Sequence, residues 1–467
     1  MSLLTSDISY PAEQQAYAER VKRIVCADGR IPKAQVVTYG CQQNVSDSQR
    51  LKGMLSLMGY EITENQEEAD FIIFNTCAVR EHAEDRVFGN VGATKKLKKE
   101  NKNLLVAVCG CMAQQQSVAD RFKESYPYVD IVFGTQVFHR LPEFIYKRLN
   151  SGRRVFELEI KNEKIVEGLP VDREDRFKGY IPIMYGCDNF CTYCIVPYVR
   201  GRERSRSAEV ILKEAKQMVD SGYKEIMLLG QNVNSYGKGS SDGINFAKLL
   251  RMVNDIEGDF RIRFMTSHPK DCTEELLEAM RDCKKVERHL HLPFQSGNNR
   301  VLNSMNRRYT REKYLSLINS AREKMPDIAF TSDIIVGFPG ETYEEFKDTL
   351  SLVNEVEFAS LFTFIYSPRG GTPAAILPDP ISRKEKGIWF DELLKAQDRI
   401  AKKLNNKAVG QVVRVLIEEA APADGYLIGK SSGTLNIYVK GGESLIGTFK
   451  NVKIDSYSNV LYGTVIE

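Results

Sequence analysis

Cys187-Asp-Asn-Phe-Cys191-Thr-Tyr-Cys194 places three cysteines in a C-x₃-C-x₂-C pattern directly after the apolar run 180–185. Three thiolates this close can bind three irons of a cubane iron–sulfur cluster and leave the fourth iron open. A structural zinc site normally has four protein ligands, and the surrounding sequence offers no fourth. The spacing also differs from the C-x₂-C-x₂-C of ferredoxins. Buried cysteines without a ligand are the third alternative, and we favour the open cluster.

The cysteine pattern opens a series of strand-like and helix-like segments. Apolar runs alternate with amphipathic stretches, which indicates parallel strands with covering helices. The six runs lie at 180–185, 225–229, 261–265, 289–294, 331–336 and 361–366. Because a full eight-unit barrel takes about 250 residues, we predict a partial (βα)6 TIM-like barrel over residues 179–404.

A second trio of cysteines belongs to an earlier alternating series at 33–150, which predicts an N-terminal parallel α/β sheet domain. Cys41, Cys77 and Cys111 each follow an apolar run. The carboxyl ends of parallel strands share one edge of a sheet, so the three thiols are expected to converge there. This arrangement predicts a second cluster with three protein ligands. Cys109 could replace Cys111, but it lies inside the apolar run and is more typical of a buried thiol.

The rest of the 467-residue chain divides into shorter segments. We predict a polar helical arm at 1–32, a linker at 151–178 and a small antiparallel β-barrel at 405–467. Hydrophobic residues make up 42% and the net charge is +3, so nucleic-acid binding would require local basic patches. No apolar run is long enough to span a membrane, and no secretion signal begins the chain, so we expect no membrane partner and a cytoplasmic protein.

The C-x₃-C-x₂-C pattern after the first strand of a partial barrel resembles the radical S-adenosylmethionine superfamily. In that superfamily the open iron binds S-adenosylmethionine, and an electron from the cluster yields a 5′-deoxyadenosyl radical. The resemblance implies cofactor contacts at the strand ends and in the cysteine loop. We assign them to Tyr193, Gln231, Ser267, Gln295, Asp333 and Gly337. Each motif alone is also typical of ordinary loop turns.

Both cysteine trios together resemble the methylthiotransferases, which carry two 4Fe–4S clusters. The resemblance rests on Thr-Tyr-Gly-Cys41, Asn-Thr-Cys77, Gly-Cys111-Met-Ala-Gln and the barrel cysteines. Leu-Leu-Gly-Gln-Asn-Val-Asn-Ser-Tyr236, Thr-Ser-His-Pro269 and Pro-Phe-Gln-Ser-Gly297 resemble the MiaB branch in particular. The branches that modify a ribosomal-protein aspartate or threonylcarbamoyl-adenosine remain alternatives.

The resemblance implies a reaction on tRNA. One S-adenosylmethionine donates a methyl group to a sulfur of the auxiliary cluster at Cys41, Cys77 and Cys111. A second is cleaved at the cluster of Cys187, Cys191 and Cys194, and the radical activates C2 of N6-dimethylallyladenosine beside the anticodon. The implied partners are the tRNA anticodon stem-loop, a reduced flavodoxin or ferredoxin-type electron donor, and an iron–sulfur cluster repair or carrier protein.

Two basic features could contact RNA. Arg200, Arg202 and Arg204 follow the cysteine loop, and Lys430 lies in the C-terminal barrel, which resembles the RNA-binding TRAM domain. A solvated charged loop and a barrel used only for packing are the simpler alternatives. The non-catalytic rival to the whole interpretation is an RNA-binding protein that uses its clusters structurally. Production of 5′-deoxyadenosine under reducing conditions distinguishes the two.

Overall fold

The computed structural model describes residues 10–78, 81–159 and 165–466, which form two compact units. The first unit contains Met1–Glu174, Tyr185–Asp188 and Cys194–Val210, and the second contains Asp175–Met184, Asn189–Tyr193 and Ile211–Glu467. Residues 1–9 of the expected arm and 160–164 of the expected linker lie outside the described residues. The second unit holds both the partial barrel and the C-terminal barrel.

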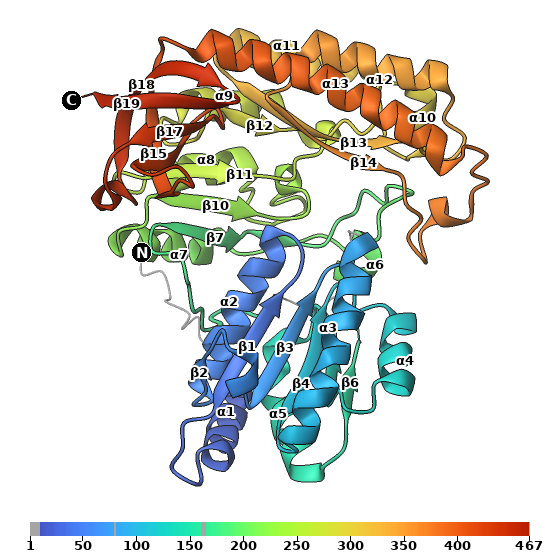
Figure 1. Ribbon diagram of the computed structural model, residues 1–467, viewed down its shortest axis with the longest axis vertical. Helices are drawn as coiled ribbons and strands as arrows, with labels where there is room; N and C mark the ends of the chain where they lie inside the picture. Colours follow the sequence, from blue (N-terminus) through green and yellow to red (C-terminus); the bar gives the residue numbers. More distant parts are fainter. Residues whose placement is uncertain (1–9, 79–80, 160–164, 467) are drawn as a thin grey trace. The chain divides into compact units, whose positions relative to one another are not determined.

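The first unit is built on a six-stranded parallel sheet, which confirms the predicted N-terminal sheet (Figure 1). The sheet has the order β2-β1-β3-β4-β5-β6. Its strands are β1 Lys33–Thr38, β2 Glu61–Ile62, β3 Phe71–Thr76, β4 Leu105–Gly110, β5 Ile131–Phe133 and β6 Val155–Glu157. The edge strand β6 comes from the segment that the sequence analysis treats as a linker.

Helices cover both faces of this sheet because its strands are apolar on both sides. In β4, Leu105, Ala107 and Cys109 pack on one face, while Val106 and Val108 pack on the other. The first face is covered by α1 Ala12–Val25, α2 Gln42–Leu57 and α5 Leu141–Ser151, and the second by α3 Glu81–Glu100 and α4 Gln116–Ser125. Helix α1 therefore belongs to the packed core, although its segment was expected to be a polar arm.

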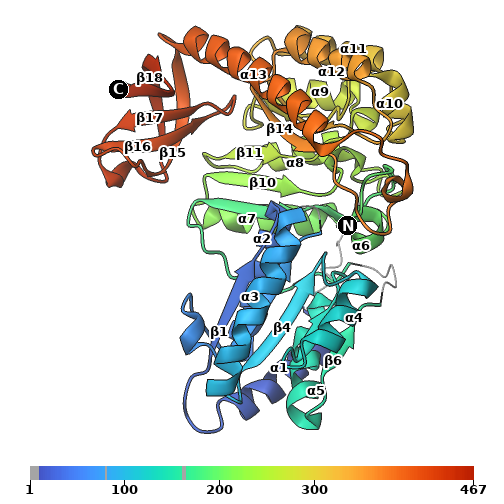
Figure 2. The same cartoon turned by 45° about the vertical axis from the view of Figure 1, so that its right-hand side comes forward.

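The second unit contains the predicted partial barrel as two three-stranded parallel sheets, β11-β10-β7 and β12-β13-β14 (Figure 2). A bridge between Ile262 and Val286 lies between the two sheets. The strands are β7 Lys178–Pro182, β10 Glu225–Leu229, β11 Arg261–Phe264, β12 His289–His291, β13 Ala329–Val336 and β14 Ser360–Ile365. All six predicted strand positions are occupied by strands.

The helices of the barrel begin at side chains that accept hydrogen bonds from the first turn. Asn245, Thr273 and Thr310 cap three of them, and Thr342 with Glu345 forms a capping box. The helices are α7 Ala208–Asp220, α8 Phe246–Asn254, α9 Glu274–Asp282, α10 Asn299–Ser304, α11 Arg311–Lys324, α12 Tyr343–Val356 and the connecting helix α13 Arg383–Ala408. The cysteine loop is flanked by the short elements β8 Met184–Tyr185, α6 Val196–Arg200 and β9 Arg204–Ser205.

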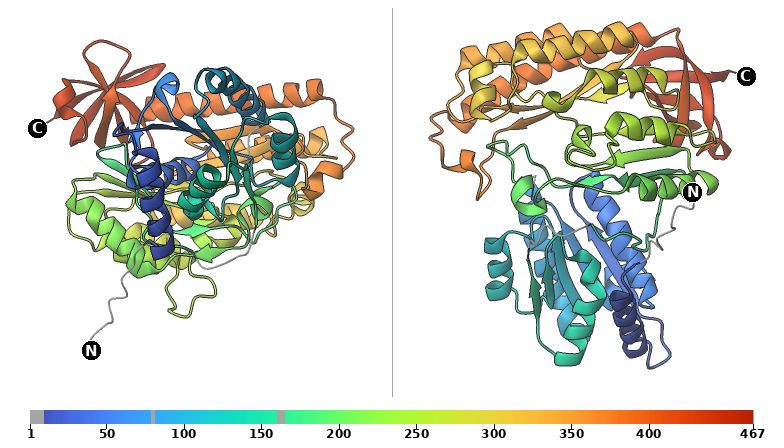
Figure 3. Two further views of the ribbon diagram at one scale, coloured as in Figure 1. Left: turned by 90° about the horizontal axis from the view of Figure 1, so that it is seen from below. Right: turned by 180° about the vertical axis from the view of Figure 1, so that it is seen from behind.

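The C-terminal segment closes into a five-stranded barrel of order β15-β16-β17-β19-β18 (Figure 3). Its strands are β15 Val412–Ala420, β16 Tyr426–Ser431, β17 Asn436–Lys440, β18 Phe449–Ser458 and β19 Val460–Ile466. The sequence predicted an antiparallel barrel, yet β17 and β19 pair in parallel. An odd number of strands cannot alternate in direction around a closed ring, so one pairing must be parallel.

Candidate active site

The three N-terminal cysteines end neighbouring strands of the first unit's sheet. Cys41 follows β1 and precedes α2, while Cys77 and Cys111 directly follow β3 and β4. The Cys111 amide donates to the Thr76 carbonyl at 2.9 Å, which places Cys111 beside Cys77. A Cβ at position 40 would lie 2.4 Å from the Cys77 Cβ, so only glycine allows this close approach. The structure thus brings the predicted trio to one edge.

Buried amides fix the backbone around these thiols. The Asn44 side chain donates to the Thr76 carbonyl at 2.9 Å, and Asn75 donates to the Asn44 carbonyl at 2.9 Å. The Cys41 thiol donates to Asn44 Oδ1 at 3.3 Å. These contacts join Cys41 and the start of α2 to the end of β3, so they hold the backbone around Cys41 and Cys77 in place.

Arg200 lies on the sulfur of Cys111. Its Nε donates to Cys111 Sγ at 3.1 Å, and its Nη2 donates to Asp47 Oδ2 at 2.7 Å. Burial raises the pKa of the Cys111 thiol to about 12, and the positive charge of Arg200 opposes that rise. The Cys77 and Cys41 thiols raise it further, which reflects how close the three sulfurs lie. The site therefore contains three neighbouring thiols and the guanidinium of Arg200.

Cys109 occupies a different environment from Cys111. It lies within β4, pairs with Asn75 and Phe133 on the neighbouring strands, and packs in the core between the sheet and α1, α2 and α5. Burial raises the pKa of its thiol well above the usual value. Cys109 is therefore a packing residue of the core, whereas Cys111 lies at the sheet edge beside Cys77.

The barrel cysteines lie on the loop between β8 and α6. Cys187 and Cys191 are buried and Cys194 is partly buried. The Cys187 amide donates to the Gly201 carbonyl at 3.2 Å, and a Cβ at position 186 would lie 2.1 Å from the Arg202 carbonyl oxygen. Gly186 has φ +81° and Phe190 has φ +47°, so the loop turns through the left-handed region twice. Backbone contacts and two residues in the left-handed region therefore fix the conformation of the loop.

Arg307 lies on the sulfur of Cys191 within the second unit. Its Nη1 donates to Cys191 Sγ at 3.4 Å and to the Tyr193 hydroxyl at 3.4 Å. Its Nη2 donates to the Pro293 carbonyl at 2.7 Å. The guanidinium is buried, and no sequence motif singled it out, because its partners come from two distant segments.

Each cysteine trio offers the donor chemistry of an iron–sulfur cluster. Within residues 10–78, 81–159 and 165–466, no three His, Cys, Asp or Glu side chains lie close enough to hold one metal ion. Thiolates are the usual protein ligands of 4Fe–4S clusters. An arginine donates to one sulfur of each trio, Arg200 to Cys111 and Arg307 to Cys191.

The expected cofactor residues lie at the carboxyl ends of the barrel strands. Gln231, Ser267 and Gln295 follow β10, β11 and β12, while Asp333 lies in β13 and Gly337 directly follows it. Tyr193 lies in the cysteine loop beside Arg307. All of them belong to the second unit, and Gln231, Ser267, Gln295 and Gly337 follow the strands at the end of the barrel where ligands bind in such folds.

This end of the barrel also carries unsatisfied polar atoms and strained backbone. Among the described residues, buried polar atoms without a hydrogen-bond partner include Asn232 Oδ1, Ser267 Oγ, His268 Nε2 and Tyr366 Oη. Thr266 and Gln295 follow β11 and β12 with φ of +71° and +65°. Orphan polar groups and strain gather at ligand sites, so these residues fit a polar ligand such as S-adenosylmethionine. Thr266, His268 and Tyr366 were not among the predicted contacts.

The expected RNA-binding residues differ in exposure. Arg200 is only 5% exposed and pairs with Asp47 and Cys111, so its guanidinium faces these protein partners and not solvent. Arg202 is well exposed and pairs with Asp188 at 3.3 Å. Arg204 is partly buried and donates to the Arg200 carbonyl at 3.2 Å. Arg202 is therefore the most accessible cation of this run.

Lys430 lies where the C-terminal barrel meets the partial barrel. Its carbonyl accepts from Arg261 Nη1 at 2.7 Å, and burial lowers the pKa of its ammonium. Arg261 also donates to Glu225 and Glu418, at 2.6 and 3.0 Å. Lys430 thus borders a buried ionic network. Partial burial leaves it less available to RNA than the sequence suggested.

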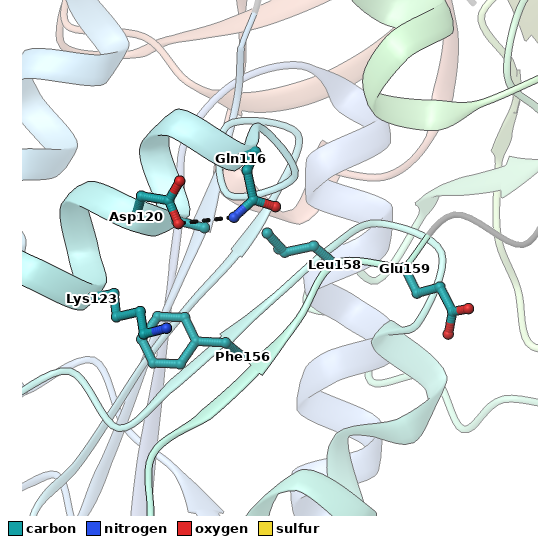
Figure 4. A pocket seen from close by; sticks show the side chains of 7 residues that line it. Gln116, Asp120, Lys123, Phe156, Leu158 and Glu159 are labelled. Carbon is teal, nitrogen blue, oxygen red and sulfur yellow. Dashed lines mark hydrogen bonds between the residues drawn. The ribbon is translucent and has the colours of Figure 1, made fainter.

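A shallow pocket in the first unit lies between α4 and β6 (Figure 4). It is lined by Gln116, Ala119, Asp120, Lys123, Phe156, Leu158 and Glu159. Gln116 Nε2 donates to Asp120 Oδ1 at 2.9 Å. None of these lining residues belongs to either cysteine site.

Three family models match consecutive parts of the chain. Residues 33–134 match the uncharacterized protein family UPF0004, residues 181–353 match the radical SAM superfamily, and residues 406–466 match the TRAM domain. The first match falls on the N-terminal sheet up to β5, the second on the partial barrel up to α12, and the third on the C-terminal barrel. The radical SAM match implies a 4Fe–4S cluster and S-adenosylmethionine in the barrel.

Curated relatives match nearly the whole chain. The tRNA-2-methylthio-N(6)-dimethylallyladenosine synthase of Caldicellulosiruptor saccharolyticus is 50% identical over 440 residues, covering 94% of this chain and 93% of the relative. The protein of the same name from Clostridium perfringens is 52% identical over 420 residues, covering 90% and 94%. The chain belongs to the MiaB-type methylthiotransferase family.

Solved structures share the fold of this methylthiotransferase at low sequence identity. The radical S-adenosylmethionine methyltransferase TsrM from Kitasatospora setae, with cobalamin and a 4Fe–4S cluster bound, superposes with a TM-score of 0.55. Identity is 14%, and the match covers 74% of each chain. In the described part of the methylthiotransferase no helix is long and apolar enough to cross a membrane.

Proposed function

We propose that this chain is a tRNA methylthiotransferase that converts N6-dimethylallyladenosine beside the anticodon to its 2-methylthio form. The observation that carries the proposal is the likeness, at about 50% identity over nine-tenths of the chain, to relatives that bear this name. The TRAM domain supports an RNA substrate. The two cysteine sites supply the chemical basis for a radical reaction that also needs a sulfur source.

Cys187, Cys191 and Cys194 hold the radical 4Fe–4S cluster in this proposal. When bound, this cluster supplies the electron that cleaves S-adenosylmethionine and so generates the radical that activates C2 of the adenine. Arg307 donates to the Cys191 sulfur and brings a positive charge to a site that three thiolates make negative. Tyr193, Gln231, Ser267, Gln295, Asp333 and Gly337 orient the cofactor at the strand ends.

Cys41, Cys77 and Cys111 would hold an auxiliary 4Fe–4S cluster, which when bound would supply the sulfur of the methylthio group. The cysteines lie on a base of buried asparagines, so their sulfurs keep their positions as the site is loaded. A consumed cluster must be rebuilt, which implies a cluster carrier or repair protein. The radical cluster needs a flavodoxin or ferredoxin-type reductant.

Arg202 and Arg204 are the proposed phosphate contacts beside the cysteine loop, and Lys430 is a weaker candidate on the C-terminal barrel. An exposed guanidinium binds phosphate with little desolvation, which favours Arg202. The target base must leave its loop stack to present C2, which costs a few kcal/mol.

The deciding experiment is mass spectrometry of tRNA nucleosides from cells with and without the gene for this chain. Loss of 2-methylthio-N6-dimethylallyladenosine, with accumulation of the unmethylthiolated nucleoside, is expected. Loss of a 2-methylthio-threonylcarbamoyl nucleoside instead would assign the chain to the sister branch. Unchanged tRNA nucleosides would contradict the proposal.

A further inference from the structure

The first unit contains an unexpected physical link between the two cysteine trios. The short helix α6 (Val196–Arg200) begins two residues after Cys194 and packs on the carboxyl edge of the N-terminal sheet. Ile195 and Val199 form a small buried cluster with Ala78 and Cys111. The Thr135 hydroxyl also donates to the Val199 carbonyl at 2.6 Å. The segment that follows Cys194 therefore packs directly against Cys111, one of the three N-terminal cysteines.

The last residue of this helix makes the contact to sulfur. Arg200 donates through Nε to Cys111 Sγ at 3.1 Å and through Nη2 to Asp47 Oδ2 at 2.7 Å. Its carbonyl accepts from Gln136 Nε2 and from Arg204 Nη2, both at 3.2 Å. Both ends of the residue are thus fixed, and the guanidinium plane has one orientation.

Gly201, the residue after Arg200, contacts the loop that carries Cys187, Cys191 and Cys194. The Gly201 carbonyl accepts from the Cys187 amide at 3.2 Å. A side chain at position 186 would collide with this same carbonyl, at 2.5 Å. The contacts therefore run without interruption from Cys111 Sγ through Arg200 and Gly201 to the main chain of Cys187. This chain of contacts therefore includes one cysteine of each trio, Cys111 and Cys187.

We propose that Arg200 is a positioning residue that couples the two cluster sites. It holds the Cys111 sulfur in a fixed relation to the main chain of Cys187, which is a ligand of the radical cluster in the proposed function. The inference rests on the proposed function, because it assigns a purpose to a contact between two sets of cluster ligands. It gives Arg200 a role that its place in a basic run does not suggest.

The chemistry of the side chain favours arginine for this task. A guanidinium presents several N–H groups in a rigid plane, so one residue can donate to a carboxylate and to a sulfur at once. A lysine ammonium keeps the positive charge but lacks the planar set of N–H groups that contacts Asp47 and Cys111 together. Arg200→Lys therefore tests geometry with charge preserved, and Asp47→Asn loosens the same fork with the arginine preserved.

The test measures how well radical formation and product formation stay linked. Arg200→Lys and the wild-type chain are reconstituted anaerobically and reacted for a single turnover with a prenylated anticodon stem-loop. Iron should remain at about eight per chain, from two cubanes of four. The ratio of methylthio product to 5′-deoxyadenosine should fall at least about tenfold, because a small misplacement of reacting groups costs this much or more.

A second readout does not depend on turnover. In a Cys187→Ala/Cys191→Ala/Cys194→Ala background, Arg200→Gln removes a cation beside the auxiliary cluster. The midpoint potential of that cluster should become more negative, because the reduced cluster carries more negative charge. If the Arg200 variants fail to fold, Asp47→Asn replaces them in the test. The ratio of methylthio product to 5′-deoxyadenosine should fall in Asp47→Asn also.

The matched control is Arg30→Lys. Arg30 pairs with Asp70 through two hydrogen bonds of 3.1 and 2.7 Å, but it is exposed and lies at the amino end of the strands. Arg30→Lys should have the same ratio of methylthio product to 5′-deoxyadenosine as the wild type. The midpoint potential of its auxiliary cluster should also be unchanged. An unchanged ratio and potential in the Arg200 variants, or a proportional fall of both products, would overturn the coupling role. A wild-type chain without methylthio product would instead contradict the proposed function.

Discussion

Each compact unit buries an arginine against a cysteine sulfur, but the two units balance its charge differently. In the first unit Arg200 contacts Cys111 and pairs with the carboxylate of Asp47 at 2.7 Å. In the second unit Arg307 contacts Cys191 and is otherwise surrounded by hydroxyl and carbonyl oxygens. Among the described residues no carboxylate pairs with Arg307. The carboxylate of Asp47 therefore balances the charge of Arg200, whereas no carboxylate of the described residues balances the charge of Arg307.

The difference separates structural from ligand-dependent stability. A buried cation paired with a carboxylate is compensated within the protein. A buried cation without an anion costs free energy until a negative group arrives. The three thiolates of a cluster are such a group, so the barrel site should depend on its cluster for stability more than the N-terminal site does.

Removing either cysteine trio should remove one cluster and leave the other. Anaerobically reconstituted protein should contain about eight irons, and Cys187→Ala/Cys191→Ala/Cys194→Ala should contain about four. Cys41→Ala/Cys77→Ala/Cys111→Ala should also contain about four, but should still form some 5′-deoxyadenosine. Iron analysis and product quantification check both variants. Loss of all iron from a folded triple variant would show that the sites are not independent.

Cys109 and Cys111 test the assignment inside the N-terminal site. Cys111→Ala should lose the auxiliary cluster, because Cys111 lies beside Cys77 and accepts from Arg200. Cys109→Ala should keep it and lose only a little packing, because its thiol faces the core. Iron content and the absorbance of the cluster distinguish the two variants. The reverse result would move the ligand to Cys109.

The sequence predicted the framework of both sites because that framework follows from periodicity. The run 225–229 and strand β10 coincide, and every predicted barrel run contains a strand. Cys41, Cys77 and Cys111 were placed at one edge because parallel strands must end together. These inferences need only the local pattern and the direction of the chain.

The surroundings of the sulfurs could not be predicted in this way. Arg200 lies in a basic run, and its true partner Asp47 is 153 residues away in the sequence. Arg307 meets Cys191 across 116 residues. Such contacts depend on tertiary packing, which charge patterns do not encode. Helix α1 shows the same limit, since its polar composition concealed the buried residues Ala18 and Val21.

Replacing the two arginines should have opposite effects on the iron-free protein. Arg200→Met leaves Asp47 buried without its cation and should lower the free energy of unfolding by about 3–5 kcal/mol. Arg307→Met removes an uncompensated charge and should leave the stability unchanged or raise it by about 1 kcal/mol. Urea denaturation of the iron-free chains, followed by circular dichroism, measures both. Equal losses would remove the contrast between the sites.

The smallest effect concerns a buried carboxyl group that accepts its hydrogen bonds from backbone amides, whereas Asp47 accepts from an arginine. Glu341 accepts from the Gly337 and Phe338 amides at 2.7 and 3.2 Å, and burial raises its pKa to about 7. A carboxyl whose pKa is raised in the folded state stabilises the fold fully below its unfolded pKa of about 4.5. That contribution is lost as the pH rises through 7.

Glu341→Gln keeps an oxygen for both amides and removes the charge. The variant should show a flatter dependence of unfolding free energy on pH between about 5 and 8, with a gain of up to about 3 kcal/mol at pH 8. Urea denaturation at pH 6 and pH 8 measures the slope, and Glu344→Gln, at an exposed neighbouring position, is the control. Identical slopes in the wild type and the variant would show that Glu341 is ionised throughout. The barrel site would then tolerate buried charge as well as the N-terminal site does.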